Sequence, residues 1–550
     1  MRRLWNADLG DGTYKNPILF ADYSDPDVMR VDDTYYMTAS SFNYVPGLPI
    51  LISKDLVNWK LVNYAIDKIN YEKYDEPQHA KGVWAPAIRY HEGEFYIYYG
   101  MPDEGIFMVK TKDALGKWEE PVLVLEGKGL IDPCPFWDED GKAYVVHGYA
   151  KSRIGFKSFL GIFEMSWDGK EAVGEDHILY NGLETQPTIE GPKVYKRDGY
   201  YYIFAPAGSV KTGWQTILRG KNIHGPFDEK IVLHQGSTAI NGPHQGALVD
   251  TINGDEWFVH FQDRGMYGRI VHLQPVNWVD GWAVMGENAV DYCGEPVAVC
   301  HKPNVTPVGT ENADNASTEA MGSETQELCY LEASDDFSSE KLDLMWQWLG
   351  NPKEDFYSLT ANPNHLRLYC KNPSGAIEPI LWDNSNVLTQ KLVCPYFTAE
   401  SCLHIGGLME REQAGMVMMG GDYAYLGVRV TAEGTELVLS QSADKKNGAI
   451  KANGQSTEKE ENVTTLVKLD DEQEKVWLVF EIKEIEGTLS FEMRYSLDRE
   501  HYTEVPVEFM PSDHTWVGAK IGLFANACGQ EMGGYGDFEY IEVKNASECN

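Results

Sequence analysis

Three acidic residues at separate points of the chain begin short, proline-containing motifs. Asp25 opens Asp-Pro-Asp, Asp132 opens Asp-Pro-Cys, and Glu190 opens Glu-Gly-Pro. Carboxyl groups held in different surroundings can divide acid and base work, one keeping a proton while another accepts one. The alternative is that these motifs only favour turns, as Asp and Pro often do. A shared position within a repeat favours the chemical interpretation.

The motifs belong to a fivefold repeat. Each repeat has a Pro-containing start, a short apolar strand, a polar two-residue turn and an aromatic-rich strand. The turns are Asp32-Asp33, Glu92-Gly93, Asp140-Gly141, Asp198-Gly199 and Asn253-Gly254, 48 to 60 residues apart. Strand–turn–strand content at this period predicts a five-bladed β-propeller. Rotation about its axis would gather the starts at one end of the central channel, which brings the three acids together.

The composition limits the number of domains, the fold class and the kinds of partner to be expected. A chain of 550 residues should hold two or three domains. Its 43% apolar content, rich in aromatic and β-branched residues, favours an all-β protein. A net charge of −37 disfavours nucleic acid and anionic membrane as partners. The nine cysteines show no zinc or disulfide spacing, and no phosphate-binding loop or G-x-S-x-G motif occurs.

Residues 1–19 contain no apolar stretch typical of a signal peptide, and no segment is long and apolar enough to span a membrane. We therefore expect a cytoplasmic protein with reduced thiols.

The chain divides by composition. Residues 1–300 hold the repeats and predict the propeller, and residues 301–330 have the polar composition of a linker. Residues 331–550 alternate short strands and polar turns, which predicts an antiparallel β-sandwich of jelly-roll type. Within it, Ser440–Glu461 is poor in apolar residues and is expected to be an exposed excursion between strands.

Five runs of the N-terminal half form a specific set: NPILFADYSDPDVMRVDDTYYMTASSFNYVPGLPILISKDLVNW, VWAPAIRY, LIDPCPFWDEDGKAY, EGPKVYKRDGYYYIF and LQPVNWVDGW. Together they resemble glycoside hydrolase family 43, whose five-bladed propellers act on plant polysaccharides containing arabinose and xylose. LMWQWLGNP, NVLTQKL and YGDFEYIEV are similar to the concanavalin-like sandwich of the family's β-xylosidase-type members. The resemblance covers nearly the whole chain except the linker and Ser440–Glu461.

The resemblance implies roles for the three acids. It makes Asp25 the general base that activates water and Glu190 the general acid. Asp132 would tune the pKa of its neighbour and fix its orientation. For that chemistry Glu190 must hold a proton near neutral pH, so we expect burial or the Asp132 anion to raise its pKa. Inversion would place the two working carboxyl groups roughly 6.5–9.5 Å apart.

The resemblance also implies supporting residues. Phe42 and Trp84 would wall the sugar pocket, Arg269 would contact sugar hydroxyls, and His244 would bind calcium or an ordered water at the axis. Trp516 would lie in a sandwich loop that closes the pocket. Three of these residues have a simpler alternative: Trp84 and His244 could be core residues, and Arg269 could be a surface residue. The segment DRGMYGRIVHLQPV around Arg269 departs from the best-known xylosidase branch, so sugar preference stays open.

No cofactor is expected for the chemistry, but structural Ca²⁺ is a candidate. Besides His244, the candidate ligands are Asp335, Asp336 and Asp537 near the ends of the sandwich, where paired acids bind calcium in similar modules. The alternative is that they are ordinary surface acids in an acidic chain.

These expectations combine into an exo-acting, inverting glycosidase. It would release terminal α-L-arabinofuranosyl or β-D-xylosyl units from oligosaccharides derived from xylan, arabinoxylan or arabinan. The alternatives are a sugar-binding propeller without catalysis and a retaining fructan- or sucrose-splitting enzyme. The partner expected is the oligosaccharide, with a homo-oligomer as an open option.

Overall fold

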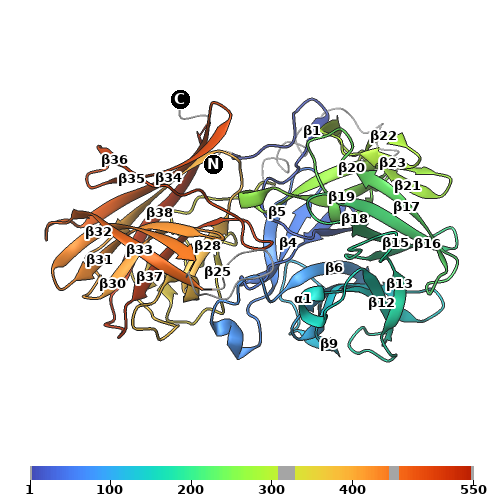
Figure 1. Ribbon diagram of the computed structural model, residues 1–550, viewed down its shortest axis with the longest axis horizontal. Helices are drawn as coiled ribbons and strands as arrows, with labels where there is room; N and C mark the ends of the chain where they lie inside the picture. The colour runs from blue at the N-terminus through green and yellow to red at the C-terminus, as the bar shows by residue number, and fades with distance from the viewer. Residues whose placement is uncertain (1–2, 307–328, 445–457, 547–550) are drawn as a thin grey trace, which may run out of the picture.

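Five antiparallel sheets arranged around an axis form the N-terminal half of the protein (Figure 1). The computed structural model describes residues 3–306, 329–444 and 458–546. Each sheet is built from four consecutive strands, and the predicted all-β propeller is confirmed. The strands of blades one to three are β2 (Asp27–Val31), β3 (Thr34–Thr38), β4 (Gly47–Ser53) and β5 (Lys60–Ile66); β6 (Trp84–His91), β7 (Glu94–Met101), β8 (Gly105–Thr111) and β9 (Val122–Glu126); and β10 (Leu130–Trp137), β11 (Ala143–Tyr149), β12 (Phe159–Met165) and β13 (His177–Asn181).

Blades four and five complete the ring. Their strands are β14 (Lys193–Arg197), β15 (Tyr200–Ala207), β16 (Trp214–Gly220) and β17 (Phe227–His234), then β18 (His244–Asp250), β19 (Glu256–Asp263), β20 (Arg269–Val279) and β21 (Trp282–Met285). The fourth sheet is extended by β22 (Glu287–Val290) and β23 (Cys293–Glu295), and β1 (Thr13–Lys15) pairs with β24 (Val299–His301). The described helical segments are short: α1 (Lys151–Ile154), η1 (Glu72–Asp75), η2 (Gly265–Tyr267) and η3 (Leu381–Asp383).

All five predicted turns join the first two strands of a blade. Each of these turns contains at least one residue with positive φ, for example 48° at Glu92 and 84° at Gly93. Positive φ is least costly for Gly and is also tolerated by Asp, which is why Gly and Asp recur at these turns.

The innermost strands β2, β6, β10, β14 and β18 surround the axis. A cavity of about 540 Å³ is lined by residues from the C-terminal parts of all five strands, including Arg30, His91, Trp137, Lys196 and Asp250. The starts of these strands therefore lie at the opposite end of the same channel, where the sequence places the acids.

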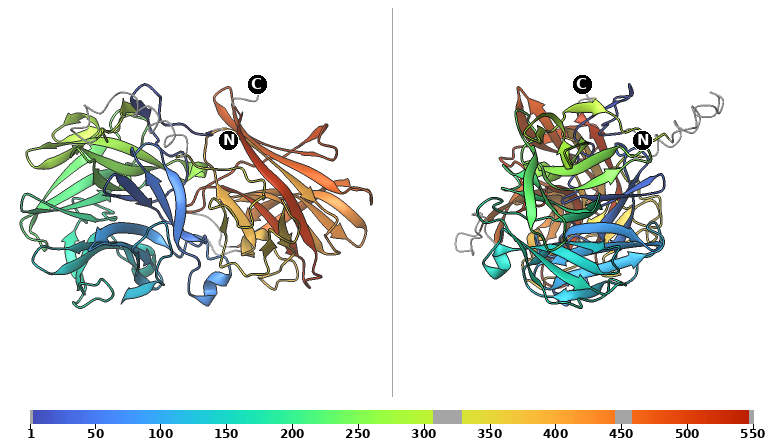
Figure 2. Two further views of the ribbon diagram at one scale, coloured as in Figure 1. Left: turned by 180° about the vertical axis from the view of Figure 1, so that it is seen from behind. Right: turned by 90° about the vertical axis from the view of Figure 1, so that its right-hand side faces the viewer.

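The C-terminal half is a sandwich of two seven-stranded antiparallel sheets (Figure 2). The first sheet contains, in order, β25 (Gln347–Trp348), β28 (Val387–Lys391), β37 (Lys520–Ala527), β30 (Glu412–Met419), β31 (Tyr423–Thr431), β32 (Gly434–Asp444) and β33 (Lys459–Lys468). The second contains β26 (Tyr357–Ser358), β27 (Leu366–Tyr369), β38 (Tyr535–Asn545), β29 (Phe397–His404), β34 (Lys475–Ile485), β35 (Thr488–Ser496) and β36 (Tyr502–Val505).

The expectation of an exposed excursion at Ser440–Glu461 is wrong at both of its ends. Ser440–Asp444 belongs to β32 and Lys459–Glu461 to β33, while residues 445–457 lie outside the described part of the chain. Glu461 is held by the backbone N–H of Leu381 at 2.9 Å and by the hydroxyl of Tyr423 at 2.8 Å. Polar residues do not mark exposure here because the partners of Glu461 come from distant segments, η3 and β31.

The predicted linker, residues 301–330, lies mostly outside the described residues, which omit 307–328. On either side of that gap the two halves share one apolar core, which combines propeller residues such as Ile50 with sandwich residues such as Trp348. Val45 and Trp348 exchange backbone hydrogen bonds of 3.1 and 2.6 Å. The side chain of Asn351 bonds both the N–H and the C=O of Ile69, at 2.9 and 2.8 Å.

Asn351 tests how strongly the two halves depend on each other. Asn351→Ala leaves the backbone N–H of Ile69 buried without a partner, while the Ile69 carbonyl keeps only the N–H of Tyr71 at 2.8 Å. We therefore expect a loss of about 1–3 kcal/mol in stability, seen as a lower melting temperature. The control is Asn70→Ala, which removes an exposed amide bonded only to Glu120 at 3.3 Å. Equal melting temperatures for the two variants would contradict this role.

Candidate active site

The three acids meet at one end of the propeller channel. Asp25 and Asp132 are 5% and 3% exposed, whereas the side chain of Glu190 is 28% exposed. Asp25 and Asp132 both have a φ of 56°, outside the usual range for residues with a side chain. Each lies directly before a proline at the start of an innermost strand, where the distorted backbone turns the carboxyl group toward the channel end.

The five starts align on their positive-φ residues, and this corrects one detail of the predicted repeat. The equivalent residues are Asp25, Ala85, Asp132, Gly191 and Gln245, with φ between 27° and 57°. Glu190 therefore precedes the position of the other two acids and is level with Trp84 and His244. The sequence motif obscured this because glycine, rather than glutamate, occupies the left-handed position in blade four.

Asp25 is surrounded by donors. Ser24 and Ser40 donate hydroxyl hydrogen bonds of 2.8 and 2.6 Å to its Oδ2, and Nη1 of Arg269 donates to its Oδ1 at 2.9 Å. Arg269 is 7% exposed and lies in blade five, so its pair with Asp25 joins the last blade to the first. The alternative of a surface arginine is excluded.

Asp22, which the sequence motifs did not single out, connects this region to the sandwich. Its two carboxylate oxygens accept the backbone N–H groups of Arg269 and Gly518, both at 2.9 Å. A Cβ atom on Gly518 would lie 2.5 Å from the nitrogen of Gly268, so the two backbones approach as closely as glycine allows. The loop between β36 and β37 is thereby fixed against blade five.

Asp132 and Glu190 form a linked pair. Oδ2 of Asp132 accepts the N–H of Gly191 and the amide of Gln245, each at 2.8 Å, so Asp132 holds the residue next to Glu190. Burial, followed by the charges of Glu190 and Asp25, raises the pKa of Asp132 well above its usual value.

The pKa of Glu190 moves in the opposite direction. Burial acts to raise it, but Nε2 of His244, 2.8 Å from Oε1 of Glu190, more than offsets this and lowers the pKa below its usual value. The expectation of a raised pKa for Glu190 is therefore wrong for the protein without substrate. No sequence motif indicated that His244 would bond this carboxyl group.

His244 itself is 1% exposed, and its Nδ1 has no hydrogen-bond partner among the described residues. Calcium prefers six to eight oxygen ligands. Among the described residues His244 joins no group of three side chains able to share a metal. These residues do not fit a calcium site built by protein groups, and no chemical step is assigned to an ion here.

Asp335, Asp336 and Asp537 are also not gathered into a shared ligand group within the described parts of the chain. Asp335 accepts the indole N–H of Trp346 at 2.9 Å. Both oxygens of Asp537 accept hydrogen bonds of 2.8 Å from the guanidinium of Arg367.

The aromatic residues form one cluster between the two halves. Phe42 and Trp84 meet edge to face with ring centres 6.5 Å apart, and Trp84 meets Trp516 in the same way at 4.6 Å. The guanidinium of Arg153, another residue without a sequence signal, lies 5.2 Å from the ring centre of Trp84. Trp516 belongs to the sandwich loop that Gly518 anchors, so a sandwich residue reaches the propeller beside the acids.

Comparisons with known proteins agree with this arrangement. The family models "Glycosyl hydrolases family 43" and "Beta xylosidase C-terminal Concanavalin A-like domain" match residues 14–283 and 334–544. A putative beta-xylosidase of Xylanibacter ruminicola is 42% identical over 392 residues, 70% of this chain and 67% of that protein. A non-reducing end alpha-L-arabinofuranosidase of Bacteroides ovatus, BoGH43B, is 28% identical over 98% of this chain and 97% of its own length.

Among solved structures, a bifunctional GH43-CE protein of Bacteroides eggerthii has a TM-score of 0.78 and 27% identity. The match covers 96% of this chain but only 63% of that protein. In the described parts of the chain, no helix has the length and apolar character needed to cross a membrane. With its matching family models, its relatives and its gathered acids, the chain belongs to glycoside hydrolase family 43.

Proposed function

We propose that the protein is an exo-acting, inverting glycosidase that removes terminal β-D-xylosyl or α-L-arabinofuranosyl units from hemicellulose-derived oligosaccharides. The observation that carries this proposal is the gathering of Asp25, Asp132 and Glu190 at one channel end in three different environments. The names of the relatives support both sugars. A cytoplasmic location also remains a proposal, to be tested by cell fractionation.

Asp25 is suited to act as general base. Its carboxylate accepts hydrogen bonds from Arg269 and two serines, which fix its orientation toward an attacking water. Glu190 is suited to donate a proton because it is the acid that solvent and substrate can reach. A neutral acid is needed when the glycosidic oxygen leaves, since the transition state already carries positive charge on the sugar.

Substrate binding must shift the proton between the paired acids. Without substrate, the raised pKa belongs to Asp132 and the lowered one to Glu190. A sugar covering the exposed part of Glu190 would remove water from it, and loss of water raises the pKa of a carboxyl group. Asp132, which accepts two hydrogen bonds from the channel wall, then serves as the nearby anion. Its negative charge favours a protonated Glu190.

The sandwich accounts for the exo preference in this proposal. Trp516 places an aromatic side chain of the sandwich against Trp84 on the propeller. A wall on that side would leave room for the end of a sugar chain and obstruct a continuous one.

Leaving-group dependence tests the two main roles. For Glu190→Ala we expect kcat to fall about 10²–10⁴-fold on xylobiose, whose leaving oxygen needs a proton, and much less on 4-nitrophenyl β-D-xylopyranoside. Asp25→Ala should be impaired on both substrates, because water activation is needed in each case. Paired rates on the xylopyranoside and 4-nitrophenyl α-L-arabinofuranoside identify the preferred sugar. Equal losses for Glu190→Ala on good and poor leaving groups would contradict its role as acid.

The stereochemical outcome separates this enzyme from a retaining fructan- or sucrose-type propeller. We expect proton NMR during hydrolysis of the β-xyloside to detect α-xylose first, because water attacks directly from the Asp25 side. First formation of β-xylose would reject the inverting mechanism.

The variant Asp132→Asn tests how much the ionisable carboxyl group of Asp132 lowers the stability of the folded protein. The folded-state pKa of Asp132 is raised, so wild-type stability declines as pH rises above the unfolded-state pKa of about 3.9. The amide cannot ionise, so we expect the variant to melt at a higher temperature than wild type at pH 7 and to lose that advantage below pH 4. Activity should fall by about 100-fold or more. A lower melting temperature at pH 7 would contradict the assignment.

A further inference from the structure

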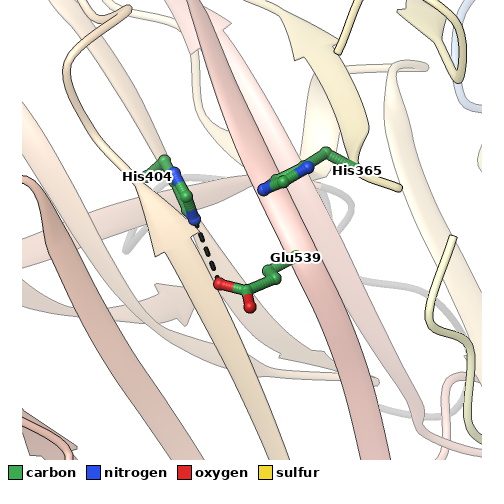
Figure 3. A group of neighbouring side chains, drawn as sticks. All are labelled: His365, His404 and Glu539. Carbon is green, nitrogen blue, oxygen red and sulfur yellow. Dashed lines mark hydrogen bonds and ion pairs between the residues drawn. The ribbon is translucent and has the colours of Figure 1, made fainter. Parts of the chain in front are cut away.

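A second group of chemically active side chains lies on the sandwich, outside the site described above. Figure 3 shows His365, His404 and Glu539 pointing toward one another. Their ligand atoms all lie within 4.8 Å of one another, and among the described residues no other three His, Cys, Asp or Glu side chains meet in this way. None of the three has a part in the proposed hydrolysis.

Three neighbouring strands bring these residues together. His365 directly precedes β27, whose pairing of Leu366 with Phe538 places it opposite Glu539 on β38. His404 ends β29 on the other side of β38. The pairing of β29 with β38 is irregular here, because Ser401 opposes Ile541 while Leu403 opposes Phe538. Glu539 and Tyr540 thus oppose one residue of β29, and such a bulge redirects side chains.

The imidazole of His365 has the hydrogen bonding and the free nitrogen expected of a metal ligand. Its Nδ1 lies 3.0 Å from the carbonyl oxygen of Pro363, a contact that requires the proton on Nδ1. The other nitrogen, Nε2, then presents a lone pair, and it is buried without a hydrogen-bond partner. A buried polar atom with no partner is costly, whereas a backbone-bonded imidazole with a free nitrogen is the usual form of a metal-binding histidine.

His404 and Glu539 are already spaced for coordination. Nε2 of His404 lies 3.2 Å from Oε2 of Glu539. Two ligands bound at about 2.0 Å to one tetrahedral ion are roughly 3.3 Å apart.

We propose that His365, His404 and Glu539 form a binding site for a divalent transition metal ion of the Zn²⁺ or Ni²⁺ type. Two imidazole nitrogens and one carboxylate suit such ions and do not suit Ca²⁺, which prefers oxygen ligands. Water would fill the remaining positions. The bound ion would connect β27, β38 and β29 and so stabilise the sandwich sheet.

Lys475 is the competitor that the ion has to displace. Its ammonium group lies 3.2 Å from the same Oε2 of Glu539, and its side chain is 36% exposed. The lysine can therefore turn into solvent when the carboxylate binds a metal. Because of this competition, removal of Lys475 should strengthen metal binding, whereas removal of a ligand should weaken it.

The test uses the full chain, stripped with EDTA and titrated with ZnCl₂ or NiCl₂ in a calorimeter, with melting temperatures measured in parallel. We expect wild type to bind one ion at this site and to melt a few degrees higher with metal than without. His365→Ala and His404→Ala should each weaken binding about 100-fold or more and abolish the melting shift. Lys475→Ala should bind more tightly than wild type.

His501→Ala is the matched control. His501 lies on the same domain, is 83% exposed and contacts Asp498, so its loss should leave the affinity unchanged. CaCl₂ should produce no comparable shift. Binding that survives both ligand-removing variants, unchanged affinity in Lys475→Ala, or no binding by folded wild type would each overturn the proposal.

Discussion

The buried ion pair between Asp25 and Arg269 is the interaction on which the catalytic end of this protein depends. An ion removed from water has to be compensated by a close partner, and here the two partners come from the first and the last blade. The four strands of each blade are consecutive in the chain, so the ring is closed by contacts between the first and last blades, of which this pair is one. The same pair orients the proposed base, which couples the closure of the fold to its chemistry.

The turn that carries Asp25 also sets the position of the sandwich. Asp22, three residues earlier, accepts one backbone N–H from blade five and one from the loop that bears Trp516. Together with the bridge between Val45 and Trp348, this makes the sandwich part of the site's framework. The sandwich backbone approaches the glycine residues beside the acids within contact distance. An appended domain whose role was only to increase solubility would not need such a contact.

Each of the three acids in the site has a different local partner. Asp25 is matched by arginine, Glu190 by histidine, and Asp132 only by neutral donors. Asp132 therefore bears the cost of bringing three carboxyl groups together, which appears as its raised pKa. Positive φ angles at Asp25 and Asp132 add backbone strain that the surrounding blades have to maintain, as is common where side chains must converge.

Strand periodicity, hairpin turns and Asp-Pro starts are local patterns repeated along the chain, and from them the propeller, the sandwich and three candidate acids could be predicted. The groups that face these acids could not be predicted, because they come from other parts of the chain. The bond between Glu190 and His244 and the pairing of Arg269 with Asp25 join different blades. Glu461 is bonded by Leu381 in η3 and by Tyr425 in β31, 80 and 36 residues away. Likewise, His365, His404 and Glu539 meet only through strand register and a bulge. Contacts between distant segments depend on how sheets pack, and no short stretch of sequence encodes that packing.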